Sequence, residues 1–86
     1  MYKISEDVVL RPDDGKILVL ETGNVIEVND SGVFILKCLE TPNSINDLIS
    51  SVEDNYQTSD INPGEIKEIV TEFVNFCEEN KIIVTV

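Results

Sequence analysis

The residues that could do chemistry in this chain are few. Among its 86 residues there is no histidine, and the two cysteines, Cys38 and Cys77, stand far apart in apolar segments. The adjacent carboxylates Asp13-Asp14 and Glu78-Glu79 fall at a predicted turn and a predicted helix end, where solvated charge is expected. Catalysis needs a nucleophile with its base, or paired carboxylates held in a pocket, and the sequence offers neither. We therefore expect a binding protein and not an enzyme, with no metal and no cofactor.

The charge of the chain narrows the choice of partners. Seventeen Asp and Glu against six Lys and Arg give a net charge of −11, which repels phosphate backbones and anionic membranes. The N-terminus has no apolar stretch of signal-peptide length, and no run approaches the roughly 20 apolar residues of a membrane span. We expect a cytoplasmic protein that binds neither nucleic acid nor membrane. Its acidity favours a basic peptide or protein patch, or serves solubility alone. In that compartment both cysteines should remain reduced core thiols.

The elements that must position a binding surface begin with strands. The length allows one hydrophobic core, so residues 1–86 are predicted to form a single domain. Alternating and β-branched residues predict strands over 8–11, 16–20 and 24–28. Turn residues separate them at Pro12–Gly15 and at Thr22–Asn24. The prediction is a three-stranded antiparallel meander.

Capping signals then predict helices. Asn29, Asp30 and Ser31 are N-cap candidates for a short apolar helix that ends before Thr41. Ser44 and Asp47 form a variant capping box that opens a second helix reaching about residue 56.

A polar loop is expected over 57–61. Asn62 then caps a third helix, with Pro63 at its first position, that runs to about Asn80. The β-branched tail Ile82–Val86 is expected either to form a further strand or to pair with the meander.

The predicted third helix has more apolar residues than one core-facing stripe requires. They cover an arc of roughly 160°, whereas one buried side usually needs just over 100°. Either the domain wraps this helix on two sides, or one flank lines a groove, while Glu72 falls on the solvated face. The apolar residues are Ile66, Ile69, Val70, Phe73, Val74, Phe76 and Cys77.

The order of elements and several groups of residues resemble the PqqD-like family, also called the recognition element of ribosomally made, post-translationally modified peptides. The resemblance spans almost the whole chain, and it rests on spaced core and cap residues with no catalytic signature. The matching residues are Val9-Leu10-Arg11, Asp14-Gly15, Val28 to Gly32, Ile35 to Leu39, Ser44 to Ile49, Tyr56, and Ile69 to Phe73. The tail over 82–86 is more strand-like than the plain ending of the family.

The resemblance implies an α+β fold like a winged helix-turn-helix, with a three-stranded antiparallel sheet followed by three helices and, here, a possible short C-terminal strand. It implies a peptide chaperone that binds the leader segment of a precursor peptide. The leader adds as a strand beside the third strand and lies against the third helix. The partner is a separate modifying enzyme, such as a radical S-adenosylmethionine protein or a leader peptidase.

The expected peptide-binding residues lie on those two elements. Ile26 and Val28 should point inward, toward the third helix, which leaves Glu27 able to meet a basic residue. Period-two alternation leaves open which backbone groups of this strand face the free edge. The candidate residues are Asn24, Val25, Ile26, Glu27, Val28, Ile66, Ile69, Val70, Phe73 and Phe76.

Three alternatives remain at this point. A winged-helix nucleic-acid-binding protein should carry Lys and Arg on its recognition helix, whereas the second and third predicted helices carry mainly Asp and Glu. An acidic carrier protein could use the serine of Asp30-Ser31 for attachment, but carriers are helical from the start and Ser31 fits a helix cap better. The third is an acidic protein-interaction domain of another kind.

Overall fold

The computed structural model describes residues 1–56 and 63–86. The predicted loop over 57–61 and the predicted cap Asn62 therefore lie outside the described residues. Strands and helices follow one another as β1 (Tyr2–Ile4), β2 (Val8–Arg11), β3 (Lys16–Val19), β4 (Asn24–Glu27), α1 (Asp30–Cys38), α2 (Ile45–Tyr56), α3 (Pro63–Glu79) and β5 (Ile83–Thr85). This is the predicted α+β order with an additional strand at the N-terminus.

The predicted meander is confirmed as an antiparallel sheet of order β2-β3-β4. Gly15 closes the first hairpin with φ +64°, a left-handed conformation that favours glycine. A Cβ at this position would also lie 2.9 Å from the carbonyl oxygen of Val28. β3 and β4 each end one residue earlier than the sequence predicted, at Val19 and Glu27.

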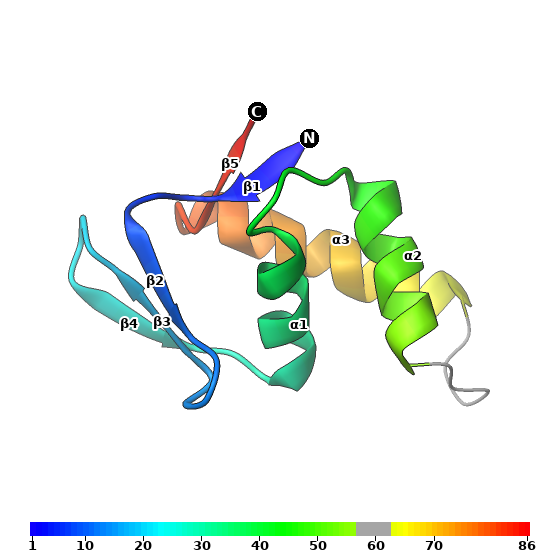
Figure 1. Cartoon of the computed structure of the whole chain (residues 1–86), viewed down its shortest axis with the longest axis horizontal. Coiled ribbons are helices and arrows are strands. Elements are labelled where there is room, and N and C mark those ends of the chain that lie inside the picture. The colour runs from blue at the N-terminus through cyan, green and yellow to red at the C-terminus, as the bar shows by residue number, and fades with distance from the viewer. Residues whose placement is uncertain (57–62) are drawn as a thin grey trace.

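The sheet has one core face and one outer face. Ile17 and Val19 are buried on the core face, and Leu10 and Ile26 pack beside them at the edge of the core. The side chains between them along each strand point the other way, because side chains alternate across a strand. The core face lies beside α1, which Figure 1 shows between this sheet and α2.

α1 begins with a cap that the sequence placed among three candidates. The Asn29 side chain accepts a hydrogen bond from the Gly32 backbone N–H at 2.9 Å, so Asn29 is the N-cap. Ser31 already lies inside the helix, and the expectation that Ser31 is the cap is wrong. The reason is geometric: a cap accepts from the residue three positions on while its own backbone stays extended, as Asn29 does at φ −80° and ψ 177°.

α2 and α3 follow their predicted signals closely. The Asp47 N–H donates to Ser44 Oγ at 3.1 Å and the Ser44 N–H donates to Asp47 Oδ2 at 3.4 Å, which confirms the capping box. α3 ends in a Schellman motif, in which Ile82 N–H donates to the Cys77 carbonyl at 2.8 Å and Lys81 N–H to the Glu78 carbonyl at 3.2 Å. Lys81 takes the left-handed conformation, φ 59°, that this motif requires.

The C-terminal strand is confirmed, but its partner differs from the alternative that the sequence raised. β5 pairs with β1 and not with the meander, in the register Tyr2↔Thr85, Lys3↔Val84 and Ile4↔Ile83. The Schellman motif reverses the chain after α3, which buries Ile82 and Ile83. Figure 1 shows β1 and β5 side by side, with both chain ends beside them.

The core is apolar throughout. Buried residues from every layer meet in one cluster, which includes Ile17, Ile35, Leu36, Leu39, Leu48, Val70, Val74, Cys77, Ile82 and Ile83. Between described residues one ion pair is formed, Lys81 to Glu21 at 3.7 Å, and both side chains are well exposed. Exposed ion pairs contribute little to stability, so burial of apolar surface holds these elements together.

Candidate functional site

The free edge of β4 is the first component of the site. Val28 N–H donates to the Gly15 carbonyl at 2.8 Å, which makes these two residues a hydrogen-bonded pair of the β3–β4 ladder. In an antiparallel ladder such pairs alternate with pairs whose backbone groups point away from each other. The backbone N–H and C=O groups of Ile26 therefore point toward Ile17 of β3, while those of Val25 and Glu27 point away from β3.

These outward groups have no partner in the described part of the chain. Among residues 1–56 and 63–86, no backbone hydrogen bond outside the ladder involves Val25 or Glu27. β4 thus presents two donors and two acceptors, on alternate residues, along an open sheet edge. The parity that alternation alone left open is settled by the Val28–Gly15 bond.

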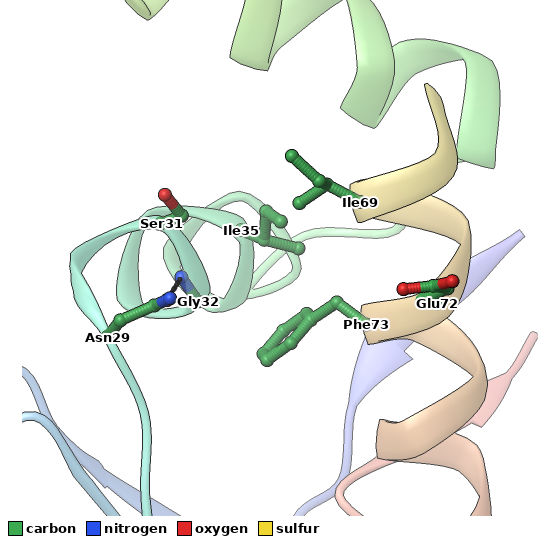
Figure 2. Close-up of a pocket in the computed structure, with 7 residues that line it drawn as sticks. All are labelled: Asn29, Ser31, Gly32, Ile35, Ile69, Glu72 and Phe73. Atoms are coloured by element: carbon green, nitrogen blue, oxygen red, sulfur yellow. Dashed lines mark hydrogen bonds between the residues drawn. The ribbon is translucent and has the colours of Figure 1, made fainter. Parts of the chain in front are cut away.

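A groove beside this edge is the second component. It has a volume of about 410 Å³ and lies between α1 and α3, where Figure 2 shows Ile69 and Phe73 pointing from α3 toward α1. The apolar side chains of its lining are Ile35, which is buried, and Ile69 and Phe73, which are partly exposed. The described residues that line it are Asn29, Ser31, Gly32, Ile35, Ile69, Glu72 and Phe73.

Gly32 is what allows Phe73 to close in on α1. A Cβ at Gly32 would lie 3.0 Å from Phe73 Cε1 and 3.1 Å from the Cβ of Val28. The ring therefore sits against the first turn of α1, next to the residue that follows β4. Its other neighbour is Phe76, with ring centroids 6.3 Å apart. Phe73 joins the groove to the end of the open strand.

The predicted residues on α3 divide into two groups. Ile69 and Phe76 are 47% and 40% exposed, and Phe73 is half-buried. Ile66 and Val70 are buried, at 6% and 0% exposure, so they support α3 from the core and present no side-chain surface to a ligand. Within the wide apolar arc of α3, Ile66 and Val70 are therefore buried, while Ile69 and Phe73 line the groove.

The predicted residues on β4 also divide. Ile26 and Val28 are half-buried and pack against the core, as expected. Asn24, Val25 and Glu27 are exposed. The sequence did not identify the α1 residues of the groove, Asn29, Ser31, Gly32 and Ile35, nor Glu72, which it placed on the solvated face. A glycine inside a helical pattern often marks a close approach, and Gly32 carried that signal.

The groove lining carries little charge, and the two cysteine thiols of the chain are protonated at neutral pH. Among the described residues that line the groove there is one carboxylate, Glu72, and no cation. Burial raises the pKa of Cys77 to about 12, and burial also raises the pKa of Cys38, against a hydrogen bond from Ser51 that lowers it. Both thiols are therefore protonated at neutral pH and are weak nucleophiles.

Two searches of the described residues bear on metals and membranes. They contain no group of three histidine, cysteine, aspartate or glutamate side chains that could hold a metal ion. In the same ranges, 1–56 and 63–86, no helix is both long enough and apolar enough to span a bilayer.

Comparison with solved structures shows that this fold is known. One similar chain is TbiB1 in complex with the TbiA(beta) leader peptide, with a TM-score of 0.79, 19% sequence identity, and coverage of 98% of this chain and 96% of that chain. A second is lasso peptide synthetase B1 complexed with the leader peptide, with a TM-score of 0.78, 14% identity, and coverage of 98% of both chains. At these identities the likeness concerns the fold.

Comparison of the sequence itself supplies the family. No curated protein matches the chain. The family model of coenzyme PQQ synthesis protein D matches residues 6–83, which span β2 to the start of β5. The resemblance seen in the sequence is confirmed, and the chain belongs to the PqqD family.

Proposed function

We propose that this domain is a non-catalytic peptide chaperone that binds the leader segment of a ribosomally made precursor peptide and presents it to a separate modifying enzyme. One observation carries the proposal: the unpaired backbone groups of Val25 and Glu27 lie along an open strand edge that ends at the groove. An extended peptide can satisfy these groups as an added strand, while its alternate side chains fill an adjacent groove.

The burial pattern suits such a ligand. Peptide side chains on the core side of an added strand would lie next to Ile26 and Val28 and face the groove, where Phe73 and Ile69 offer exposed apolar surface. Burial of apolar side chains there would supply affinity, and the backbone ladder would set the register. The two solved structures of the same fold are both leader-peptide complexes, which supports the proposal by analogy.

The charges indicate what kind of leader is favoured. The chain carries −11 overall, Glu72 lines the groove, and Glu27 is exposed on the open strand. A basic leader is attracted by this field, whereas a nucleic acid is repelled. The partner enzyme is proposed to be a radical S-adenosylmethionine protein or a leader peptidase.

The test is a calorimetric titration of the purified chain with the leader segment of a short precursor encoded beside its gene. We expect a Kd of about 1 μM or tighter, which corresponds to about −8 kcal/mol, and no modification of the peptide by this chain alone. Affinity for a basic leader should fall as salt is raised, because exposed charges are screened. A scrambled leader of the same composition controls for charge alone.

Amide hydrogen exchange locates the binding mode. Strand addition at β4 should slow exchange of the Val25 and Glu27 amides when the leader binds, because only these N–H groups gain a partner. The Ile26 and Val28 amides already face β3 and should change little. Equal binding of the scrambled peptide, or protection that appears elsewhere and not at Val25 and Glu27, would contradict the proposal.

A further inference from the structure

The outer face of the three-stranded sheet carries an apolar row that ends at the open edge. Val9 lies directly opposite Leu18, and Leu18 directly opposite Val25. Val9 is 40% exposed and Val25 is 59% exposed, while Leu18 between them is half-buried. The last member of the row, Val25, is also one of the two residues whose backbone groups face outward.

A charged row runs beside the apolar one. Arg11, Lys16 and Glu27 lie opposite one another across the three strands, and all are exposed. Glu27 is the member at the open edge, and within residues 1–56 and 63–86 it forms no ion pair with Lys16 or any other cation. A hollow of about 290 Å³ lies between the rows, lined by Arg11, Asp14, Lys16, Leu18 and Val25.

A strand added at β4 would extend both rows. Residues directly opposite each other in neighbouring strands have side chains on the same face. Because Val25 and Glu27 would form the hydrogen-bonded pairs with the ligand, the ligand residues opposite them would point onto the outer face. The ligand residue between these two would point the other way, toward the groove and Phe73. This spacing holds whether the ligand runs parallel or antiparallel.

We propose that the outer face of the sheet also recognises the leader, through two leader side chains that do not enter the groove. This inference rests on the proposed function. The residue opposite Val25 is apolar, and the residue opposite Glu27 is lysine or arginine. These two leader residues are two positions apart, and the leader residue between them is apolar and points toward the groove. Val25 and Glu27 are thus specificity-determining residues through their side chains as well as their backbone.

The experiment selects a displayed library of random linear peptides on the immobilised full chain. The wild-type chain should enrich peptides with a basic and an apolar residue two positions apart. Glu27→Lys should change the basic position to aspartate or glutamate, and Val25→Lys should change the apolar position in the same way. Glu53→Lys, at an exposed site on α2, makes the same charge change away from β4 and should leave the selected pattern as it is.

Titration of one wild-type-selected peptide adds a quantitative readout. Its affinity for Glu27→Lys should fall about three- to tenfold, the size expected when an attractive cross-strand pair becomes repulsive. Replacing the basic peptide residue by glutamate should restore the affinity for this variant. Variants with unchanged melting temperatures are compared, and both sites are exposed.

The outcomes separate this inference from the function on which it rests. If the Glu27→Lys and Val25→Lys variants select the wild-type pattern, the outer face does not read the ligand, although strand addition with the groove stands. If the wild-type chain enriches no peptide, the proposed function fails and the outer-face inference fails with it.

Discussion

Outward backbone groups of β1 have hydrogen-bond partners within the chain, whereas those of β4 have none among the described residues. The difference distinguishes a strand that stabilises the fold from a strand that is open to a ligand. In β1 the backbone groups of Tyr2 and Ile4 point away from β5, and the chain itself supplies partners for both groups of Tyr2 and for the N–H of Ile4. Tyr2 N–H donates to the Asn43 carbonyl at 2.7 Å, Asn43 N–H donates back to Tyr2 at 2.9 Å, and Ile4 N–H donates to the Leu39 carbonyl at 2.8 Å. In β4 the corresponding groups of Val25 and Glu27 have no such partner in the described chain.

The two strands also differ in what lies behind them. All three residues of β1 are half-buried and its partner β5 begins at buried Ile83, whereas in β4 only Ile26 is half-buried and the other residues are exposed. An open edge is a liability that proteins usually cover or charge. In this protein the open edge of β4 lies beside an apolar groove, and ligands that bind by strand addition use this arrangement. The comparison teaches that the same ladder geometry is closed by the chain at β1 and keeps an open edge at β4 within the described residues.

Proline substitutions give the largest contrast within β4. Ile26→Pro removes a donor that faces β3 and leaves the Ile17 carbonyl without its ladder partner, so we expect a loss of about 3 kcal/mol in the free energy of unfolding. Glu27→Pro removes an outward donor and should cost about 1 kcal/mol or less. It should nevertheless lower leader affinity about tenfold or more, because one hydrogen bond and the Glu27 carboxylate are both lost.

Urea unfolding and leader titration of both variants measure the two effects. Thr85→Pro removes an outward donor from β5 and serves as the control, since it should leave leader affinity unchanged. A folded Glu27→Pro variant that bound the leader at full strength would show that β4 is not the strand that pairs with it.

Truncation of the groove comes next in size. Phe73→Ala should cost about 3 kcal/mol of stability, at the low end for phenylalanine because the ring is half-buried. It should weaken leader binding as well, since the ring contacts α1 and lines the groove. Glu72→Ala is the matched neighbour: stability should hold, and affinity for a basic leader should fall a few-fold and only at low salt. Thermal melting and leader titration distinguish Phe73→Ala from Glu72→Ala. Equal losses of stability in the two variants would contradict this prediction.

Alkaline pH should lower the free energy of unfolding of this protein through ionisation of Cys77. Burial raises the pKa of this thiol from 9.0 to about 12, so the protonated form is favoured by folding. The stabilisation is complete below about pH 9 and is lost between pH 9 and 12, where the unfolded thiol ionises first. The loss is about 1.4 kcal/mol per pH unit.

The measurement is urea unfolding of the wild type and Cys77→Ala across pH 8 to about pH 11. The stability difference between them should shrink with pH at that slope. If the stabilities of the two proteins changed with pH in parallel, the Cys77 thiol would have the same pKa in the folded and the unfolded protein, which contradicts the prediction. Cys38→Ala should show a weaker trend, because Cys38 is only partly buried and Ser51 offsets part of its shift.

The smallest effect concerns the cap at the mouth of the groove. Asn29→Ala removes the acceptor for the Gly32 N–H and should cost about 1 kcal/mol. Asn29→Asp keeps an acceptor at the same place and should retain most of the stability. Thermal unfolding of the two variants tests this, and an equal loss in both would show that the side-chain cap is not the source.

Local chemistry predicted much of this fold. The Ser44 and Asp47 pair defined the start of α2, Pro63 the start of α3, and Gly15 the first hairpin, because each depends on backbone groups a few residues away. Where several candidates were adjacent, as in Asn29-Asp30-Ser31, the sequence located the cap to within two residues and left the choice among them open, and the structure assigns it to Asn29. The candidate site followed the same rule: Ile69 and Phe73 were found on the apolar arc of α3, whereas Gly32 and Glu72 of the groove were missed.

What the sequence by itself determined was the three strands of the meander, the three helices, the capping box of α2 and the charges, since periodicity and capping act over a few residues; β1 was not predicted. Only the tertiary structure decided that the tail pairs with β1, that Ile66 and Val70 turn into the core while Ile69 faces the groove, and that Val25 and Glu27 face the open edge. The physical reason is that strand pairing and parity have a period of two and depend on which distant segment packs alongside. A shift by one residue would exchange the bonded and the free backbone groups of β4 without altering any local propensity.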